Sequence, residues 1–194
     1  YILIFLPVLL LYILSMKKMD NKNLVIICFF LGCFTILGQG LMEEKVNTNR
    51  QDTLRGSITK ERSWWDLTYY HLDIKVFPEK KYISGSNTVG YRVLETKKLM
   101  QIELQQPMII TSVTSMGKNL KFYRDGNAYF IKMNKRQKVG EVNYIKINYQ
   151  GSPKEAIRAP WDGGLSWDKD QNGNHFIATS CQGLGASVWW PNKD

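Results

Sequence analysis

Histidine and cysteine are scarce in this 194-residue sequence, which limits the chemistry the chain can carry. The two histidines, His71 and His175, lie far apart, and no His-Glu-x-x-His motif is present. Cys28 and Cys33 fall in an apolar N-terminal stretch, which leaves Cys181 alone in the rest of the chain. A single cysteine cannot form an internal disulfide, and no metal-ligand spacing surrounds it. We therefore expect neither catalytic residues nor a metal site in this chain.

A concentrated patch of one charge is also missing. The formal net charge is +9, from 26 basic and 17 acidic residues. The basic residues are scattered, mostly at alternate positions in strand-like runs, whereas a nucleic-acid binder usually gathers them on one face. This pattern favours a solvated surface and predicts no nucleic-acid partner. The hydrophobic share of 44% and the charged share of 22% are typical of a globular protein.

No apolar run is long enough to cross a bilayer comfortably, which takes roughly 20 residues. Two shorter runs, residues 1–15 and 24–38, open the chain. From Met16, a basic stretch, the second run and small residues near positions 38–40 follow the layout of a secretory signal peptide. We therefore expect residues 1–40 to be an apolar leader of an exported protein. In this interpretation, translation starts at Met16 and residues 1–15 lie upstream of the true start.

Two alternatives stay open for the leader. A membrane hairpin of two short helices would bring the chain into contact with a membrane, although Pro7 and the short runs weigh against it. Residues 30–33 (Phe-Leu-Gly-Cys) resemble a lipoprotein cleavage box in which Cys33 would be lipidated. Phenylalanine stands there in place of the usual aliphatic residue. The mature protein would be periplasmic, on the outer surface or membrane-associated.

Period-two patterns dominate the chain after residue 64. The polar stretch 41–63 shows no sustained period and is interpreted as a linker. Residues 64–194 predict an all-β domain, an antiparallel saddle or sandwich, because short strand-like runs recur at regular spacing. Asp125-Gly126 is a signal for a two-residue hairpin loop. Residues 151–170 are predicted to form a long loop with Trp161 and Trp167 as anchors, and residues 170–173 are predicted to form a turn. The predicted strands are residues 70–76, 83–91, 100–104, 109–115, 120–124, 128–133, 142–149 and 175–180.

Two short motifs carry a resemblance to a known family. Residues 180–194 (Ser-Cys-Gln-Gly-Leu-Gly-Ala-Ser-Val-Trp-Trp-Pro-Asn-Lys-Asp) hold Gln182 twelve residues before Asp194. Upstream, residues 70–74 and then 83–85 form an opening hairpin pattern. Together they resemble the N-terminal domain of zinc peptidases of the aminopeptidase N and leukotriene hydrolase family, in its bacterial form. The resemblance covers residues 64–194; Ser180 departs from it, because many members carry a second glutamine there.

The resemblance implies a β-saddle domain followed by a thermolysin-like catalytic domain that holds zinc. None of the motifs of that second domain is present, so we expect a chain truncated before it, with zinc bound only by the full-length enzyme. The partners implied are peptides with free N-termini and the chain's own missing catalytic domain. The alternative is an exported β-sandwich that binds a protein or glycan without catalysis.

Gln182 is the one substrate-binding residue that the resemblance implies. Its side-chain carbonyl can accept a hydrogen bond from the α-ammonium group of a peptide, and Gly183 and Gly185 would let the backbone approach closely. We expect Cys181 to be a small buried residue. His71 and His175 are expected to be partly exposed strand residues. The tryptophan pairs at 64–65 and 189–190 are expected to be packing anchors.

Overall fold

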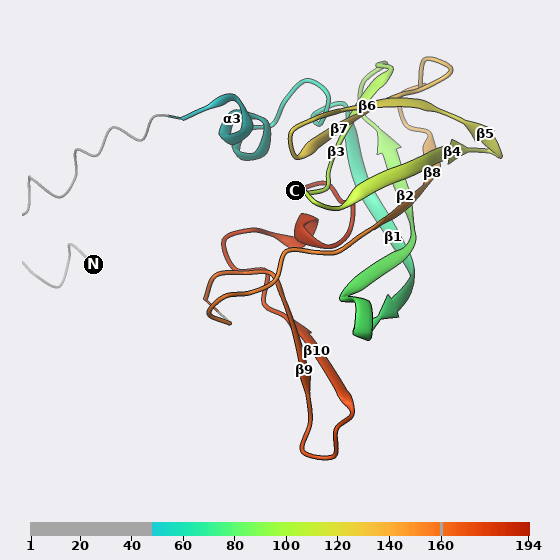
Figure 1. The fold of residues 1–194 in the computed structure, drawn as a ribbon. Coiled ribbons are helices and arrows are strands. Elements are labelled where there is room, and N and C mark those ends of the chain that lie inside the picture. Colours follow the sequence, from blue (N-terminus) through green and yellow to red (C-terminus); the bar gives the residue numbers. More distant parts are fainter. Residues whose placement is uncertain (1–47, 160) are drawn as a thin grey trace, which may run out of the picture. The chain divides into compact units, whose positions relative to one another are not determined.

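The computed structural model describes residues 48–194 except residue 160 (Figure 1). The predicted signal peptide, the alternative membrane hairpin and Cys33 therefore lie outside the described residues. Over the part of the chain that is described, no helix has the length and apolarity that a membrane crossing requires.

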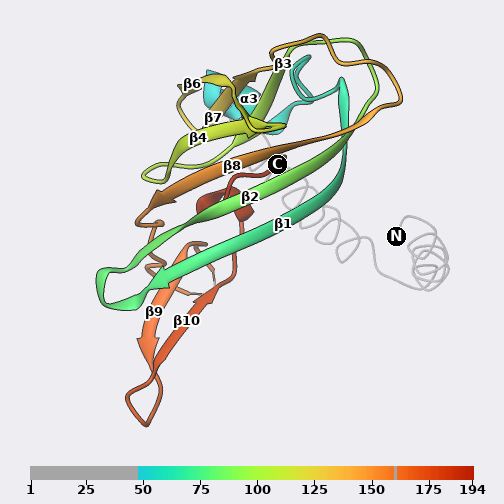
Figure 2. The ribbon, with the colours of Figure 1, turned by 90° about the vertical axis from the view of Figure 1, so that its right-hand side faces the viewer.

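Five antiparallel strands form the larger sheet, in the order β1-β2-β8-β4-β5. The first two are long: their register runs from Trp65 opposite Val93 to Phe77 opposite Tyr82, and the short 3-10 helix η2 (Pro78–Lys80) joins them. In Figure 2 the long strands lie side by side as a curved, twisted surface. The strands are β1 (Trp65–Phe77), β2 (Tyr82–Val93), β8 (Val142–Gly151), β4 (Ile109–Ser115) and β5 (Lys118–Asn119).

Three further strands form a second antiparallel sheet, in the order β3-β7-β6. These are β3 (Leu99–Glu103), β7 (Ala128–Lys132) and β6 (Lys121–Asp125). Because Asp125 pairs with Ala128, the hairpin loop is Gly126-Asn127, one residue later than the predicted Asp125-Gly126. Gly126 has φ +60°, which suits the tight turns that join two strands.

The two sheets share one hydrophobic core, as period-two patterning requires. On β8, Ile145, Ile147 and Tyr149 are buried while the residues between them are more exposed. Trp64 and Trp65 are fully buried, and each packs edge-on against the Tyr91 ring, with ring centroids 5.8 and 5.9 Å apart. The all-β antiparallel prediction and the packing role of this tryptophan pair are therefore confirmed.

The linker predicted over residues 41–63 is wrong for its described part. Helix α3 (Arg50–Gly56) forms there, and residues 48–194 belong to one compact unit. The reason lies in β7, which is buried on both faces: Tyr129 and Ile131 face the main core, whereas Ala128 and Phe130 face Leu54 of α3. A sheet with a second apolar face needs a cover, and α3 supplies it.

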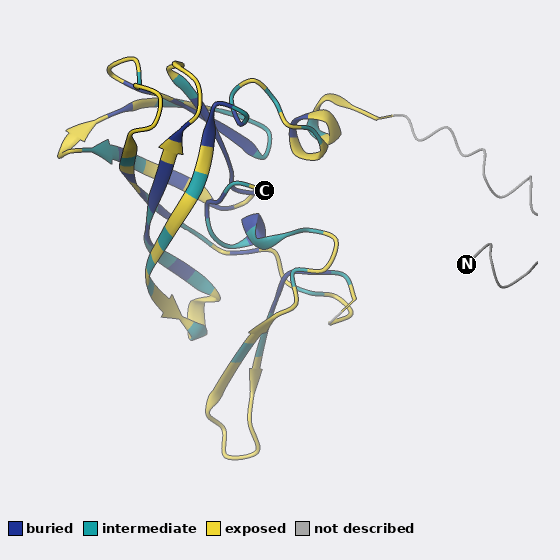
Figure 3. Cartoon of the chain, turned by 180° about the vertical axis from the view of Figure 1, so that it is seen from behind, coloured by how far each residue is buried: buried dark blue, intermediate teal, exposed yellow. Residues whose placement is uncertain are grey.

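A separate hairpin follows the sheets. The loop predicted over residues 151–170 is wrong at its end, where β9 (Leu165–Lys169) pairs with β10 (His175–Thr179). This hairpin projects away from the sheets and is largely exposed (Figure 3). Its turn agrees with the predicted turn at 170–173, because the Asp170 side chain accepts the backbone N–H groups of Asn172 and Asn174 at 2.9 and 2.8 Å. Trp161 is not an anchor, since 72% of it is exposed.

Candidate functional site

The polar face of β3 is the foundation of the candidate site. Met100, Ile102 and Leu104 enter the main core, so Gln101, Glu103 and Gln105 point to the opposite side. These three residues, here called the polar stripe, are nevertheless buried. Helix α3 and the C-terminal residues of the chain cover them, and each side chain in the stripe holds one of those segments.

Glu103 forms a buried ion pair with Arg62. The Arg62 Nη2 atom and the Glu103 Oε2 atom are 3.6 Å apart, and each side chain is only 4% exposed. Burial raises the pKa of the Glu103 carboxyl above its ordinary value, while Arg62 and the hydrogen bond from Gln101 counteract part of that rise. Arg62 also donates to the backbone carbonyls of Leu54, Arg55 and Ser57 at 3.2, 2.9 and 2.9 Å. It therefore closes the carboxyl end of α3 and ties that end to the stripe.

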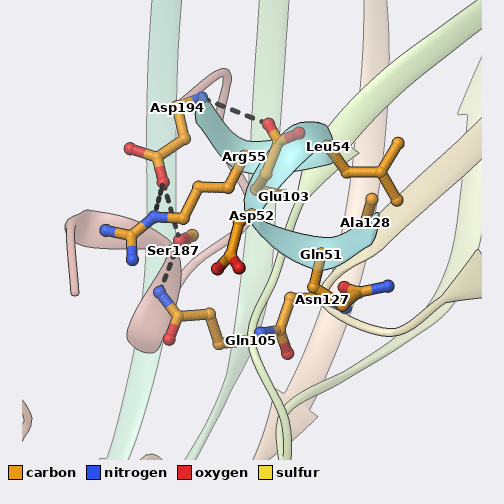
Figure 4. Close-up of a pocket in the computed structure, with 10 residues that line it drawn as sticks. All are labelled: Gln51, Asp52, Leu54, Arg55, Glu103, Gln105, Asn127, Ala128, Ser187 and Asp194. Atoms are coloured by element: carbon orange, nitrogen blue, oxygen red, sulfur yellow. Dashed lines mark hydrogen bonds and ion pairs between the residues drawn. The ribbon is translucent and has the colours of Figure 1, made fainter. Parts of the chain in front are cut away.

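Residues 181–194, here called the C-terminal segment, lie along the stripe. Glu103 and Asn192 exchange backbone hydrogen bonds of 2.9 and 3.0 Å. The Asp194 backbone N–H donates to Glu103 Oε2 at 3.2 Å, and the Gln105 amide donates to the Ser187 hydroxyl at 2.9 Å (Figure 4). The short 3-10 helix η3 (Ala186–Val188) forms at this contact. The stripe thus fixes the segment at its middle, through Ser187, and at its C-terminal end, through Asn192 and Asp194.

The two motifs behind the family resemblance are in contact. The Tyr70 hydroxyl, from the opening hairpin, accepts the Lys193 backbone N–H at 2.7 Å, and the Tyr70 ring packs edge-on against Trp190 with centroids 4.9 Å apart. Burial raises the pKa of Tyr70 to about 12. The Lys193 ammonium donates to the Trp65 carbonyl and lies 4.3 Å from the centre of its ring, and burial lowers the pKa of this lysine. The half-buried Trp190 thus anchors the segment to β1, as expected of this pair.

Gln182 lies on a tight turn, residues 181–185, here called the Gln182 turn. The Gly185 N–H donates to the Cys181 carbonyl at 2.9 Å, and positive φ values of +49°, +69° and +73° occur at Cys181, Gly183 and Gly185. Glycine adopts such φ values without strain. The Gln182 side chain is exposed, and among the described residues nothing hydrogen-bonds to it.

Asp194 lies close to this turn, although it follows Gln182 by twelve residues in the sequence. Arg55 of α3 bridges the two: its Nη2 atom donates to the Gly183 carbonyl at 2.7 Å, and its Nε atom lies 3.2 Å from Asp194 Oδ2. A Cβ atom added at Gly185 would lie only 2.9 Å from Asp194 Oδ1. The structure therefore brings Gly183, Gly185 and Asp194 together and leaves the Gln182 amide directed at solvent.

A small pocket of about 110 Å³ opens beside these contacts (Figure 4). Three carboxylates line it, from Asp52, Glu103 and Asp194, with Arg55 as the cation among them. The other lining residues are Gln51, Leu54, Gln105, Asn127, Ala128 and Ser187. Each carboxylate already has a partner within the fold: Asp194 pairs with Arg55, Glu103 pairs with Arg62 from outside the pocket, and Asp52 accepts the Asn49 N–H.

The remaining predicted residues have ordinary surroundings. His71 is exposed on β1, and His175 on β10 lies 2.9 Å from Glu79 Oε1. Within residues 48–194, no three histidine, cysteine or acidic side chains gather as a metal would require. Cys181 is half-buried rather than buried, with its sulfur 3.1 Å from the Thr179 hydroxyl. The predicted burial is therefore only partial: Cys181 begins the Gln182 turn, and its side chain packs against the main core.

Sequence reasoning missed the polar stripe, Arg55 and Arg62. The alternation on β3 was visible, but a polar face ordinarily meets solvent. One local signal for α3 does exist: Asn49 and Asp52 form a capping box, in which each side chain accepts the other's backbone N–H group. Nothing local indicates which carbonyls Arg55 and Arg62 hold, because those contacts depend on the folded chain.

Known structures share this fold. An M1 zinc metallopeptidase from Deinococcus radiodurans is 17% identical with a TM-score of 0.51, and the match covers 68% of this chain and 30% of that one. A mutant M1 zinc metallopeptidase from the same organism, bound to a Tyr-Ser-Ala substrate, is 15% identical with a TM-score of 0.51, covering 68% and 30%. Yeast LTA4 hydrolase in complex with bestatin is 14% identical with a TM-score of 0.55, covering 79% and 24%.

These likenesses establish the fold of the described residues. The chain spans between 24% and 30% of the length of the three structures. No protein-family model matches the sequence, and the curated proteins give no significant match.

Proposed function

We propose that this chain is the leader and N-terminal β-domain of an exported zinc aminopeptidase, and that it contributes Gln182 to the binding of substrate. The likeness to M1 zinc metallopeptidases and to LTA4 hydrolase supports the family assignment. The contact between the opening hairpin and the C-terminal segment supports it further, because the two motifs of the resemblance form one packed unit.

The observation that carries the role of Gln182 is the contrast between its backbone and its side chain. The backbone turn is held by Arg55 at Gly183 and by the Gln105 amide at the Leu184 carbonyl. The Gln182 amide itself is exposed and has no partner among the described residues. An acceptor carried on a backbone that is already fixed can accept one N–H of a peptide α-ammonium group by displacing water, without breaking a contact within the protein.

Gln182 adds no negative charge, so the charge that balances the ammonium must come from elsewhere. In this proposal, acidic residues of the catalytic domain supply it, where a charge-assisted bond is stronger than a neutral one. The described residues offer no ligand set for zinc, and the metal is therefore assigned to that domain as well. The part of the reaction that falls to this chain is recognition of the free amine.

The same proposal includes export of the protein, with residues 1–40 as the leader that directs it. N-terminal sequencing of the mature protein should begin within a few residues of Gln39. A mature protein that retains residues 1–15, or one that begins at a lipidated Cys33, would contradict this cleavage and support one of the two alternatives.

The function is tested with the protein purified from its complete gene. We expect it to bind zinc and to hydrolyse aminoacyl anilides, and to leave the N-acetylated forms of the same substrates intact. A chelator should abolish turnover and added zinc should restore it. A folded protein without zinc and without turnover, but with affinity for a glycan or protein surface, would instead support the binding-module alternative.

A further inference from the structure

Helix α3 contributes one side chain to the Gln182 turn, although the helix lies more than a hundred residues earlier in the chain. The Arg55 guanidinium spans two groups of the C-terminal segment, the Gly183 carbonyl at 2.7 Å and Asp194 Oδ2 at 3.2 Å. The planar guanidinium donates from two nitrogens in fixed directions, so it sets the position of both groups at once.

Arg55 can do this only because α3 is itself held in place. A seven-residue helix is marginal in isolation. Here Gln51 accepts the Asn127 N–H at 3.0 Å and donates to Asp125 Oδ1 at 3.1 Å, while Leu54 is buried under the second sheet. Arg62 holds the carboxyl end, as described above. The helix is therefore fixed at its start, its middle and its end.

The Gln182 turn, by contrast, has little support of its own. Residues 182–184 lack strand pairing, and one backbone hydrogen bond closes the turn. Two side chains from outside hold consecutive carbonyls of this turn: Arg55 holds Gly183, and Gln105 holds Leu184. Without Arg55, the Gly183–Leu184 peptide would lose the bond that fixes its orientation, and the turn that positions the Gln182 Cα would become more mobile.

We infer that Arg55 is a positioning residue that fixes the Gln182 turn, so that α3 is a working part of the substrate-amine site. The inference deepens the proposed function and rests on it for its kinetic consequence. The structural consequence, a turn whose order depends on Arg55, does not rest on that function.

The test compares three variants of the full protein: Arg55→Ala, Arg55→Lys and Arg50→Ala. Arg50 is the matched control, since it lies on the same helix but pairs with Asp125 at 2.6 Å, away from the turn. Hydrogen–deuterium exchange of the peptide covering residues 181–188 is the first measurement. We expect exchange to be about tenfold faster in Arg55→Ala and less affected in Arg55→Lys, and unchanged in Arg50→Ala. Exchange over β8 should stay constant in all three, which excludes global unfolding.

The second measurement is kinetic. Arg55→Ala should lower kcat/KM for substrates with a free amine by about tenfold. In a Gln182→Ala background the same change should cost less than about twofold, because two residues that act through one contact are not additive.

The two measurements separate the possible failures. Exchange at residues 181–188 that is the same in Arg55→Ala and Arg50→Ala would overturn the inference. Faster exchange in Arg55→Ala, in a protein without aminopeptidase activity, would support the role of Arg55 in the turn and refute the proposed function. Fully additive kinetic effects of Arg55→Ala and Gln182→Ala would also overturn the inference.

Discussion

The two sheets and the C-terminal segment belong to the same compact unit but are held by different forces. In the sheets, the main core is built from apolar side chains of alternating strand positions, as on β8, and the buried polar residues of β3 lie on the face away from that core. In the segment, Val188 and Trp190 also pack on that core, but the backbone of residues 181–194 is fixed by polar contacts with groups distant in sequence. These groups are Gln105, Glu103 and Arg55.

This difference has a consequence for function. Burial of apolar area is non-directional, and it stabilises the fold without fixing any one group precisely. Hydrogen bonds to carbonyls fix direction as well as distance. The candidate site lies where directional contacts dominate, which is the arrangement a substrate-binding acceptor needs.

The largest expected effect is loss of a core aromatic. Trp64→Ala should reduce the free energy of unfolding by about 3–5 kcal/mol, because a fully buried indole is removed and its cavity stays. Trp161→Ala is the matched control and should change the free energy by less than about 0.5 kcal/mol, since this ring is largely exposed. Urea denaturation measures both, and similar midpoints for the two variants would show that the core is not where we place it.

The next effect concerns the buried ion pair and depends on pH. Arg62→Leu should cost about 3 kcal/mol at pH 7, because it leaves the Glu103 carboxylate buried without its cation. The pKa of Glu103 is already raised by burial and would rise further without Arg62. A carboxyl group with a raised folded pKa contributes stability below its ordinary pKa and loses that contribution as pH rises through the folded value. The penalty for Arg62→Leu should therefore be largest at neutral pH and shrink toward acid pH.

Glu103→Gln provides the control for this pair. In that background, the penalty for Arg62→Leu should no longer vary with pH, because the titrating group is gone. Denaturation midpoints of the variants across the acid-to-neutral range give the answer. A penalty that stays the same at every pH in the Glu103 protein would contradict the pairing.

The smallest effect separates the two regions most clearly. Gly117→Ala and Gly185→Ala both place a side chain at φ +73°. Gly117→Ala should cost about 1 kcal/mol of stability. Gly185→Ala should cost about 1–3 kcal/mol, because its ψ of 173° lies in a region that is essentially restricted to glycine. Gly117 lies in the β4–β5 turn with open space around it, whereas a Cβ at Gly185 would meet Asp194. Only Gly185→Ala should then lower kcat/KM and speed exchange across the Gln182 turn. Equal kinetic effects of the two changes would remove the distinction between the regions.

The sheets could be predicted from the sequence because their signal is local. Alternation along a strand such as residues 142–149 indicates which side chains are buried. The strand from 109 to 115 has the predicted bounds. The helix α3 could not be predicted in the same way. Its seven residues have no sustained apolar period, and its stability comes from Leu54 under β7 and from Arg62 at its carbonyls.

The candidate site was predictable only in part. The spacing of Gln182 and Asp194 was visible in the sequence, and the structure brings Asp194 to the turn through Arg55. The positioning contacts were not visible, because a polar residue on an alternating strand normally faces water. Gln101 and Glu103 are buried instead, since two segments from the ends of the described chain cover them.

The most direct test of the account is a kinetic comparison of Gln182→Ala and Gln182→Glu with the unaltered full-length protein. If the Gln182 carbonyl holds the substrate ammonium, the alanine variant loses a hydrogen bond to a charged group, worth about 1.5–3 kcal/mol. That corresponds to a loss of roughly 10- to 150-fold in kcat/KM for peptides with free N-termini. The glutamate variant keeps an acceptor and should be affected less, and zinc content should be the same in all three proteins. An unchanged kcat/KM in Gln182→Ala would contradict the account and leave Gln182 as an exposed turn residue without a part in substrate binding.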